Sequence, residues 1–167
     1  MMRCYVVMGV SGCGKTSVGQ ALSIACDMTF IDGDDLHPQA NIEKMASGQP
    51  LDDSDRKPWL EKVGDALAET SGPVVIGCSA LKRAYRDIIR ERVPEPVLFL
   101  HLDASEQVMQ ERVNLRVGHF MPPSLLRSQF EALECLAADE LGTRIDIELP
   151  LHAVVKQTET YVRETLI

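Results

Sequence analysis

The sequence predicts an α/β fold, a parallel sheet with helices on both faces, in one domain that spans residues 1–167. Two observations predict this class. Short apolar runs alternate with longer helical segments along the chain, and strands that alternate with helices pair in parallel. The segment GVSGCGKT at residues 9–16 also follows the first apolar run and precedes a helical segment. It fits the G-x-x-x-x-G-K-[ST] pattern in its strand–loop–helix context, so the predicted class is a three-layer P-loop domain.

Each expected strand is an apolar run that turn residues bound. The strands cover Arg3–Met8, Met28–Asp32, Pro73–Cys78, Pro96–Leu102 and Arg144–Leu149. The run at Pro73–Cys78 is continuous and rich in β-branched residues, which is typical of a strand buried on both faces. Because ligands bind at the carboxyl ends of parallel strands, Asp32, Ser79 and Asp103 lie at the edge where chemistry is expected.

Helical segments connect and follow these strands. They are expected at Lys15–Asp27, Asp34–Ser47, Asp55–Thr70, Arg83–Arg92, Ser105–Arg116, Ser124–Leu136 and Leu151–Leu166. One glycine and two prolines interrupt the helical pattern at Gly118–Pro123. This interruption also carries apolar residues that could seal a cleft, so a short lid is expected at about residues 117–128.

Composition limits the classes of partner. The formal net charge of −8 argues against nucleic acid or an anionic membrane as a partner, because both require basic patches. No apolar run approaches the roughly 20 residues that span a bilayer, and no signal-peptide pattern begins the chain. The five cysteines are odd in number and lack C-x-x-C spacing, so free thiols and a cytoplasmic location are expected.

The Gly-rich loop supplies the expected nucleotide contacts. Glycines let the backbone surround an anion, and successive N–H groups then point at it from a helix N-terminus. Lys15 is expected to reach the β- and γ-phosphates of ATP, and the Thr16 hydroxyl to ligate Mg²⁺. Cys13 precedes the helix start, where the dipole lowers a thiol pKa, so we expect it to be reactive without ATP. The expected ATP-binding residues are Gly9, Val10, Ser11, Gly12, Cys13, Gly14, Lys15, Thr16 and Ser17.

Two carboxylates follow the second expected strand, in Asp32-Gly33-Asp34. Hard cations prefer carboxylate and water oxygens, so Asp32 is expected near Mg²⁺. A second acid beside a phosphate-binding loop can orient or deprotonate an attacking hydroxyl, which makes Asp34 the expected catalytic base. Asp32 stays open as the alternative base. The other interpretation is an ordinary turn in which an aspartate such as Asp35 caps the next helix.

Residues 32–60, 79–87 and 116–130 are long and distinctive segments; the first reads DGDDLHPQANIEKMASGQPLDDSDRKPWL. With the loop, they resemble the gluconate kinase (gluconokinase) family in order over residues 9–134. The resemblance implies ATP-dependent phosphorylation of D-gluconate to 6-phosphogluconate, with ATP and Mg²⁺, on a fold like that of nucleoside monophosphate and shikimate kinases. It also implies a possible homodimer.

The sequence departs from that family in two places. Cys13 stands where serine is commoner, and Lys15-Thr16-Ser17 where Lys-Ser-Thr is commoner, so a hydroxyl for Mg²⁺ is kept. After Glu134 the chain reads CLAADE, where the family shows prolines and acidic residues. We expect this region to shape the nucleotide-binding edge.

A cationic cluster is expected to hold the gluconate carboxylate. Arginine offers a planar bidentate fork and lysine a point charge, so one or two of Lys82, Arg83 and Arg86 are expected to bind it. Trp59 fits the core better than a ligand stack, and a site role for Arg56 stays open.

The remaining expected contacts flank the substrate and the lid. His37 and His119 are expected on the substrate side. Arg112 and Arg116 lie at i, i+4 on one helix face. Arg116 is expected to neutralise the transferring phosphoryl group catalytically, and Arg112 to contact the nucleotide.

Two other functions compete with this one, the first from the same class of small kinases and the second from a different class. A small kinase of shikimate or adenylylsulfate would also carry an acid pair after its second strand, but its other sequence blocks are absent here. A nucleotide-binding switch for guanine would carry N-K-x-D, and the chain has no such tetrapeptide. We therefore expect a gluconate kinase.

Overall fold

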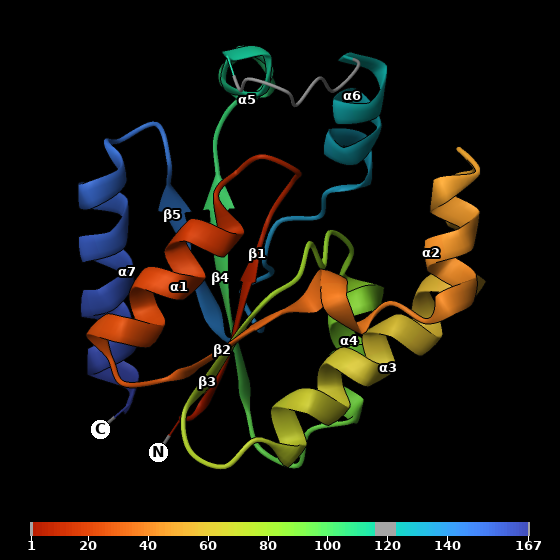
Figure 1. Ribbon diagram of the computed structural model, residues 1–167. Helices are drawn as coiled ribbons and strands as arrows, with labels where there is room; N and C mark the ends of the chain where they lie inside the picture. Colours follow the sequence, from red (N-terminus) through yellow and green to blue (C-terminus); the bar gives the residue numbers. More distant parts are fainter. Residues whose placement is uncertain (1, 116–122, 167) are drawn as a thin grey trace.

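The computed structural model describes residues 2–115 and 123–166 of the chain. Its parallel sheet has the strand order β2-β3-β1-β4-β5 (Figure 1). The strands are β1 (Cys4–Met8), β2 (Thr29–Asp32), β3 (Val74–Gly77), β4 (Val97–Asp103) and β5 (Gly142–Asp146). Val6 of β1 lies in register with Ile76 of β3 and Phe99 of β4. Since every described pair is parallel, the strands end at one common edge.

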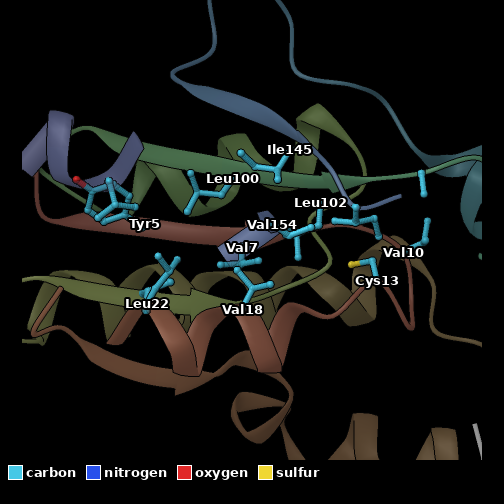
Figure 2. Close-up of a cluster of buried hydrophobic side chains, with 14 of the residues drawn as sticks. Tyr5, Val7, Val10, Cys13, Val18, Leu22, Leu100, Leu102, Ile145 and Val154 are labelled. Atoms are coloured by element: carbon cyan, nitrogen blue, oxygen red, sulfur yellow. The ribbon is translucent and has the colours of Figure 1, made fainter. Parts of the chain in front are cut away.

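Helices cover both faces of the sheet. Helices α1 (Lys15–Ala25) and α7 (Leu151–Leu166) pack on one face, and α3 (Asp53–Glu69) and α4 (Arg83–Glu91) on the other. Alternate residues of β1 enter the two cores. Tyr5 and Val7 pack with α1 and α7, as Figure 2 shows for Leu22, Val18 and Val154. Cys4 and Val6 pack on the opposite side, with α3 and α4.

Four further elements belong to the connections that follow the strands. The 3-10 helix η1 (Gly33–Leu36) and α2 (Gln39–Ala46) follow β2, and α5 (Glu106–Leu115) follows β4. Helix α6 (Pro123–Ala132) lies beside α5, beyond the carboxyl ends of the strands (Figure 1). None of the helices in the described residues is both long and apolar enough to cross a bilayer.

The predicted α/β class is confirmed, and several element boundaries are corrected. The expected helix Asp34–Ser47 is split into η1 and α2 because Pro38 lacks an N–H and keeps His37 extended. Helix α3 begins at Asp53 rather than Asp55, since Asp52 and Asp55 form a capping box. The last strand occupies 142–146 rather than 144–149, and α6 ends at Ala132 rather than Leu136.

Candidate active site

The Gly-rich loop turns tightly between β1 and α1. Gly9 and Gly14 have φ angles of 147° and 97°, which side chains rarely adopt. A Cβ on Gly9 would also lie 2.7 Å from both Cys13 Sγ and the Leu102 carbonyl oxygen. Gly14 is the N-cap of α1 in the left-handed conformation, so the following N–H groups begin the helix unblocked. Loop and helix therefore form the shape that an anion requires.

Lys15 brings its charge to the centre of this loop. Its Nζ donates hydrogen bonds to the carbonyl oxygens of Gly9 at 3.0 Å and Val10 at 3.1 Å. Carbonyls are weak partners for an ammonium group compared with a phosphate anion. The charge is therefore held inside the loop, where a phosphate can take over these hydrogen bonds.

Gln129 of α6 contacts the loop directly, a contact for which the sequence analysis assigned no role. The Ser11 backbone N–H donates to Gln129 Oε1 at 2.7 Å, and Gln129 Nε2 donates to Ser11 Oγ at 2.9 Å. A carboxamide is suited to this exchange because it carries both a donor and an acceptor. The contact joins α6 to a loop N–H of the kind that binds phosphate.

The acid turn Asp32-Gly33-Asp34 packs against the end of β3. A Cβ on Gly33 would collide with the Gly77 carbonyl oxygen, so the turn needs glycine there. Asp32 Oδ1 accepts the Asp34 backbone N–H at 3.0 Å, and the Asp34 side chain is exposed. Burial raises the pKa of the adjacent Cys78 thiol to about 12, with the Lys15 charge lowering it and the Asp34 charge raising it. Lys15 packs beside the same glycine, because a Cβ on Gly77 would lie 3.7 Å from Lys15 Cβ. The phosphate-binding loop and the acid turn therefore meet at the end of β3.

His37 and Trp59 support the acid turn. Trp59 Nε1 donates to the Gly33 carbonyl oxygen at 2.8 Å, and the indole is buried, which confirms it as a core residue. The His37 ring stacks on Trp59 with centroids 4.2 Å apart, and Asn41 Nδ2 lies 3.2 Å from its Nδ1. Burial lowers the pKa of His37, with the Asp34 charge opposing. His37 is therefore a neutral, stacked side chain next to the turn.

Two cations meet around Tyr85 on the α3–α4 side of the edge. Arg56 Cζ lies 5.5 Å and Lys82 Nζ 5.6 Å from the Tyr85 ring centroid. The Tyr85 hydroxyl donates to Asp53 Oδ1 at 2.5 Å, and Arg56 Nη1 donates to the same hydroxyl at 3.3 Å. Among the described residues, Lys82 has no carboxylate within salt-bridge distance. Arg56 also pairs with Asp53, with its Nη1 3.2 Å from Oδ1, so within the described part of the chain Lys82 carries the unpaired positive charge at this position.

The structure contradicts Arg86 as a carboxylate clamp. Its side chain is 0% exposed, and Nε and Nη2 donate to Glu140 at 2.7 and 2.9 Å. Nη1 donates to the carbonyl oxygens of Ala80 and Leu81. Arg83 is exposed in part, but it forms a bidentate pair with Asp139 at 2.7 Å for each hydrogen bond. Of the three predicted cations, Lys82 is thus the one available to a ligand.

The segment after Glu134, expected to shape the nucleotide-binding edge, packs against α4. Its acidic residues bind α4 through Arg83 and Arg86, and Leu136 packs on the α3–α4 core. A pocket of about 410 Å³ lies instead on the opposite face, beside the loop, and contains Arg112 and Cys13. It is lined by Cys13, Val18, Arg112, Ile147, Glu148, Leu149, Pro150, Leu151 and Val154. The connection from β5 to α7 therefore borders the space beside the phosphate-binding loop.

Cys13 is buried, which argues against the predicted reactivity. It is 5% exposed and lies within the cluster that contains Val10 and Val18 (Figure 2). Burial raises the pKa of its thiol, and the Lys15 charge offsets this only in part. Desolvation of the thiolate outweighs the helix dipole because the sulfur faces the core.

We therefore expect an alkylating reagent near neutral pH to label Cys135 rapidly and Cys13 slowly, with or without Mg-ATP. Cys135 is exposed, whereas Cys13 is 5% exposed although it borders the pocket beside the loop. Peptide mass spectrometry at successive times measures both rates. Rapid labelling of Cys13 that ATP prevents would restore the original prediction.

Two predicted residues cannot be placed. Arg116 and His119, with the first part of the predicted lid at 117–128, lie outside the residues that the structure describes. The second part of that range belongs to α6. Arg112 lies on α5 and is half-buried beside the pocket.

Comparisons with known proteins agree with this geometry. The model of the shikimate kinase family matches residues 11–130. The thermosensitive gluconokinase of Escherichia coli (strain K12) is 48% identical over 157 residues, which cover 92% of this chain and 83% of that protein. The crystal structure of a gluconokinase from Sinorhizobium meliloti 1021 is 47% identical, with a TM-score of 0.88, and the match covers 98% of this chain and 95% of that one. Shikimate kinase from Aquifex aeolicus, 19% identical, has a TM-score of 0.57 over 99% of this chain and 98% of that one, a likeness of fold.

Proposed function

The chain belongs to the gluconokinases, and we propose that it transfers the γ-phosphoryl group of ATP to the 6-hydroxyl group of D-gluconate. One observation carries the proposal beyond family membership. The phosphate-binding loop and the acid turn meet at Gly77, at the end of β3, and the cations Arg56 and Lys82 lie on the same side of the sheet as the acid turn. A donor site, a base and a carboxylate clamp are the parts that this reaction needs.

ATP is the phosphoryl donor in this proposal. The loop N–H groups and Lys15 bind its β- and γ-phosphates, and the hydrogen bonds of Lys15 to loop carbonyls are exchanged for phosphate oxygens. We propose that the adenine base of ATP binds in the pocket beside Arg112 and Pro150. Gln129 would release the Ser11 N–H as phosphate arrives.

Mg²⁺ is the proposed metal, and the donor chemistry fits it. The exposed Thr16 hydroxyl and the half-buried Asp32 carboxylate offer hard oxygen ligands, the second through water. When bound, the ion neutralises charge on the phosphate oxygens.

Gluconate would lie across the acid turn with its two ends held differently. Arg56 and Lys82 bind the carboxylate. Asp34 accepts the proton of the 6-hydroxyl group while the oxygen of that hydroxyl attacks the γ-phosphorus of ATP. The bond from that phosphorus to the bridging oxygen breaks, and ADP leaves. Arg116 is proposed to neutralise the transferring group, and His119 to contact the substrate.

The acceptor is tested by measuring ADP release with ATP and one acceptor at a time. The panel holds gluconate, shikimate, adenylylsulfate and nucleoside monophosphates. Gluconate should give the highest kcat/KM, because the clamp and base suit an open-chain acid with a primary hydroxyl. Preference for shikimate would contradict gluconate as the acceptor and would indicate a shikimate kinase, the family whose model matches the chain.

The carboxylate clamp predicts strong selectivity for gluconate over glucose. An uncharged sugar leaves the clamp unpaired, and sites built around a polar partner reject analogues that lack it by about 10⁴ in kcat/KM. Arg56→Leu and Lys82→Leu should each raise the KM for gluconate at least tenfold, with little change in the KM for ATP. Lys57→Leu, at an exposed neighbouring position, is the matched control. Equal use of glucose and gluconate would contradict the clamp.

Asp34→Asn should lower kcat by about 10²–10⁴ with little change in either KM, because a general base acts in the transition state. Asp35→Asn removes a neighbouring exposed carboxylate and should leave kcat within about twofold of the parent. Steady-state kinetics on both variants measures this difference. A normal kcat for Asp34→Asn would remove Asp34 from the mechanism and leave Asp32 as the remaining carboxylate.

A further inference from the structure

Three side chains that the proposed reaction does not use meet at the carboxyl end of β4. They are His101 and Asp103 of that strand, and Cys135 of the segment that follows α6. One ligand atom from each lies within 4.8 Å of the other two. His101 Nε2 and Asp103 Oδ1 are 3.8 Å apart. Imidazole, carboxylate and thiol groups are the usual protein ligands of zinc.

The surroundings of the His101 imidazole indicate that it binds a ligand. His101 is 1% exposed, and its Nε2 has no hydrogen-bond partner in the described part of the chain. A buried polar nitrogen normally has a partner, and an orphaned one calls for an explanation such as an ion. A neutral imidazole nitrogen without a proton has the lone pair that a metal binds.

The carboxylate is held with one oxygen toward the imidazole. Arg144 Nε donates to Asp103 Oδ2 at 2.6 Å, whereas Oδ1 faces His101. An outer partner that fixes a ligating carboxylate is typical of metal centres. The Arg144 charge opposes a cation, but deprotonated Cys135 and Asp103 would supply two negative charges against it.

We propose that His101 Nε2, Asp103 Oδ1 and Cys135 Sγ bind a zinc-like divalent ion, with water as a fourth ligand. A mixed nitrogen, oxygen and sulfur set selects a borderline-soft ion over Mg²⁺ or Ca²⁺. Tetrahedral zinc bonds of 2.0–2.3 Å separate the ligand atoms by roughly 3.5 Å, so atoms that now lie within 4.8 Å must approach by at most about 1.3 Å. Residues 133–137 have no regular secondary structure, and the Cys135 side chain is exposed, so a change of its rotamer can supply this movement.

Occupation of the site would tie the segment after α6 to β4. The inference does not rest on the proposed function, because none of the three residues belongs to the phosphate loop, the acid turn or the clamp. It therefore succeeds or fails separately from gluconate phosphorylation.

Cobalt is the probe, because Co²⁺ bound to a thiolate gives an ultraviolet charge-transfer band. The chelator-treated protein is titrated with Co²⁺ in excess Mg²⁺, so that oxygen sites are filled, and then with Zn²⁺. We expect one equivalent of a thiolate band that Zn²⁺ displaces. Cys135→Ser should abolish the band, and Asp103→Asn should weaken Co²⁺ binding at least tenfold. Cys26→Ser is the control variant. Cys26 is a half-buried cysteine at the C-terminal end of α1, and its substitution should leave the band unchanged.

A thermal melt gives an independent measurement. At a hundredfold excess over its Kd, Zn²⁺ should raise the Tm of the parent by on the order of 5 °C and leave that of Cys135→Ser unchanged. Absence of the band in the parent, or its survival in Cys135→Ser, would overturn the proposal. Because Cys135 is exposed, its substitution should leave the fold intact, which circular dichroism checks.

Discussion

Lys15→Ala should lower kcat by at least about 10²–10³, because the lost charge stabilises the phosphoryl group in the transition state. The substitution should leave the fold unchanged. Within residues 2–115 and 123–166, the ammonium group bonds the loop carbonyls of Gly9 and Val10 and the Cys13 sulfur. Lys156→Ala, at an exposed position on α7, is the matched control.

Kinetics and a urea melt on both variants measure this result. The control should keep the parent kcat, and both variants should unfold at the parent midpoint. Near-normal turnover by Lys15→Ala would overturn the assignment of the loop. A large loss of stability would instead make Lys15 a structural residue.

Glu140→Gln should destabilise the protein by about 3–5 kcal/mol, because it leaves the Arg86 guanidinium buried without its anion. The Glu140 side chain is 1% exposed and binds both Arg86 and Arg90. Asp139→Asn removes the neighbouring exposed pair with Arg83 and should cost less than about 1 kcal/mol. Urea unfolding near pH 7 compares the two free energies of unfolding.

The same pair predicts a pH dependence. Burial raises the pKa of Glu140, but hydrogen bonds from Arg86, the Ala137 N–H and Arg90 outweigh it and hold the pKa at about 2 instead of 4.5. This difference stabilises the fold by about 3 kcal/mol above pH 4.5, and the stabilisation is lost as the pH falls from 4.5 toward 2. The gap between the parent and Glu140→Gln should therefore close over that range. A gap that stays constant would show that the charge of Glu140 does not stabilise the fold.

Local patterns explain what could be predicted from the sequence. Glycines, a lysine and a hydroxyl within eight residues specify the loop at 9–16. Three consecutive residues, Asp32-Gly33-Asp34, specify the acid turn. The apolar runs of β1, β3 and β4 are buried on both faces of the sheet, and the β-branched run at Pro73–Cys78 predicted this for β3.

Contacts between distant residues explain the errors. Arg86 and Arg83 look alike in sequence, and only the return of Asp139 and Glu140 to α4, more than 50 residues later, separates a buried ion pair from an exposed one. Cys13 has the helix position of a reactive thiol, but the core that buries it comes from other segments. Gln129 reaches Ser11 across 118 residues, a pairing that no local pattern indicates.

The proposed reaction forms 6-phosphogluconate. Incubation of the protein with gluconate and Mg-ATP tests this claim when both products are measured, ADP and the substrate of a 6-phosphogluconate dehydrogenase. We predict that the two form in equal amounts, and that neither forms with Lys15→Ala at the parent rate. ADP release without 6-phosphogluconate, or a different phosphorylated acid, would contradict the claim.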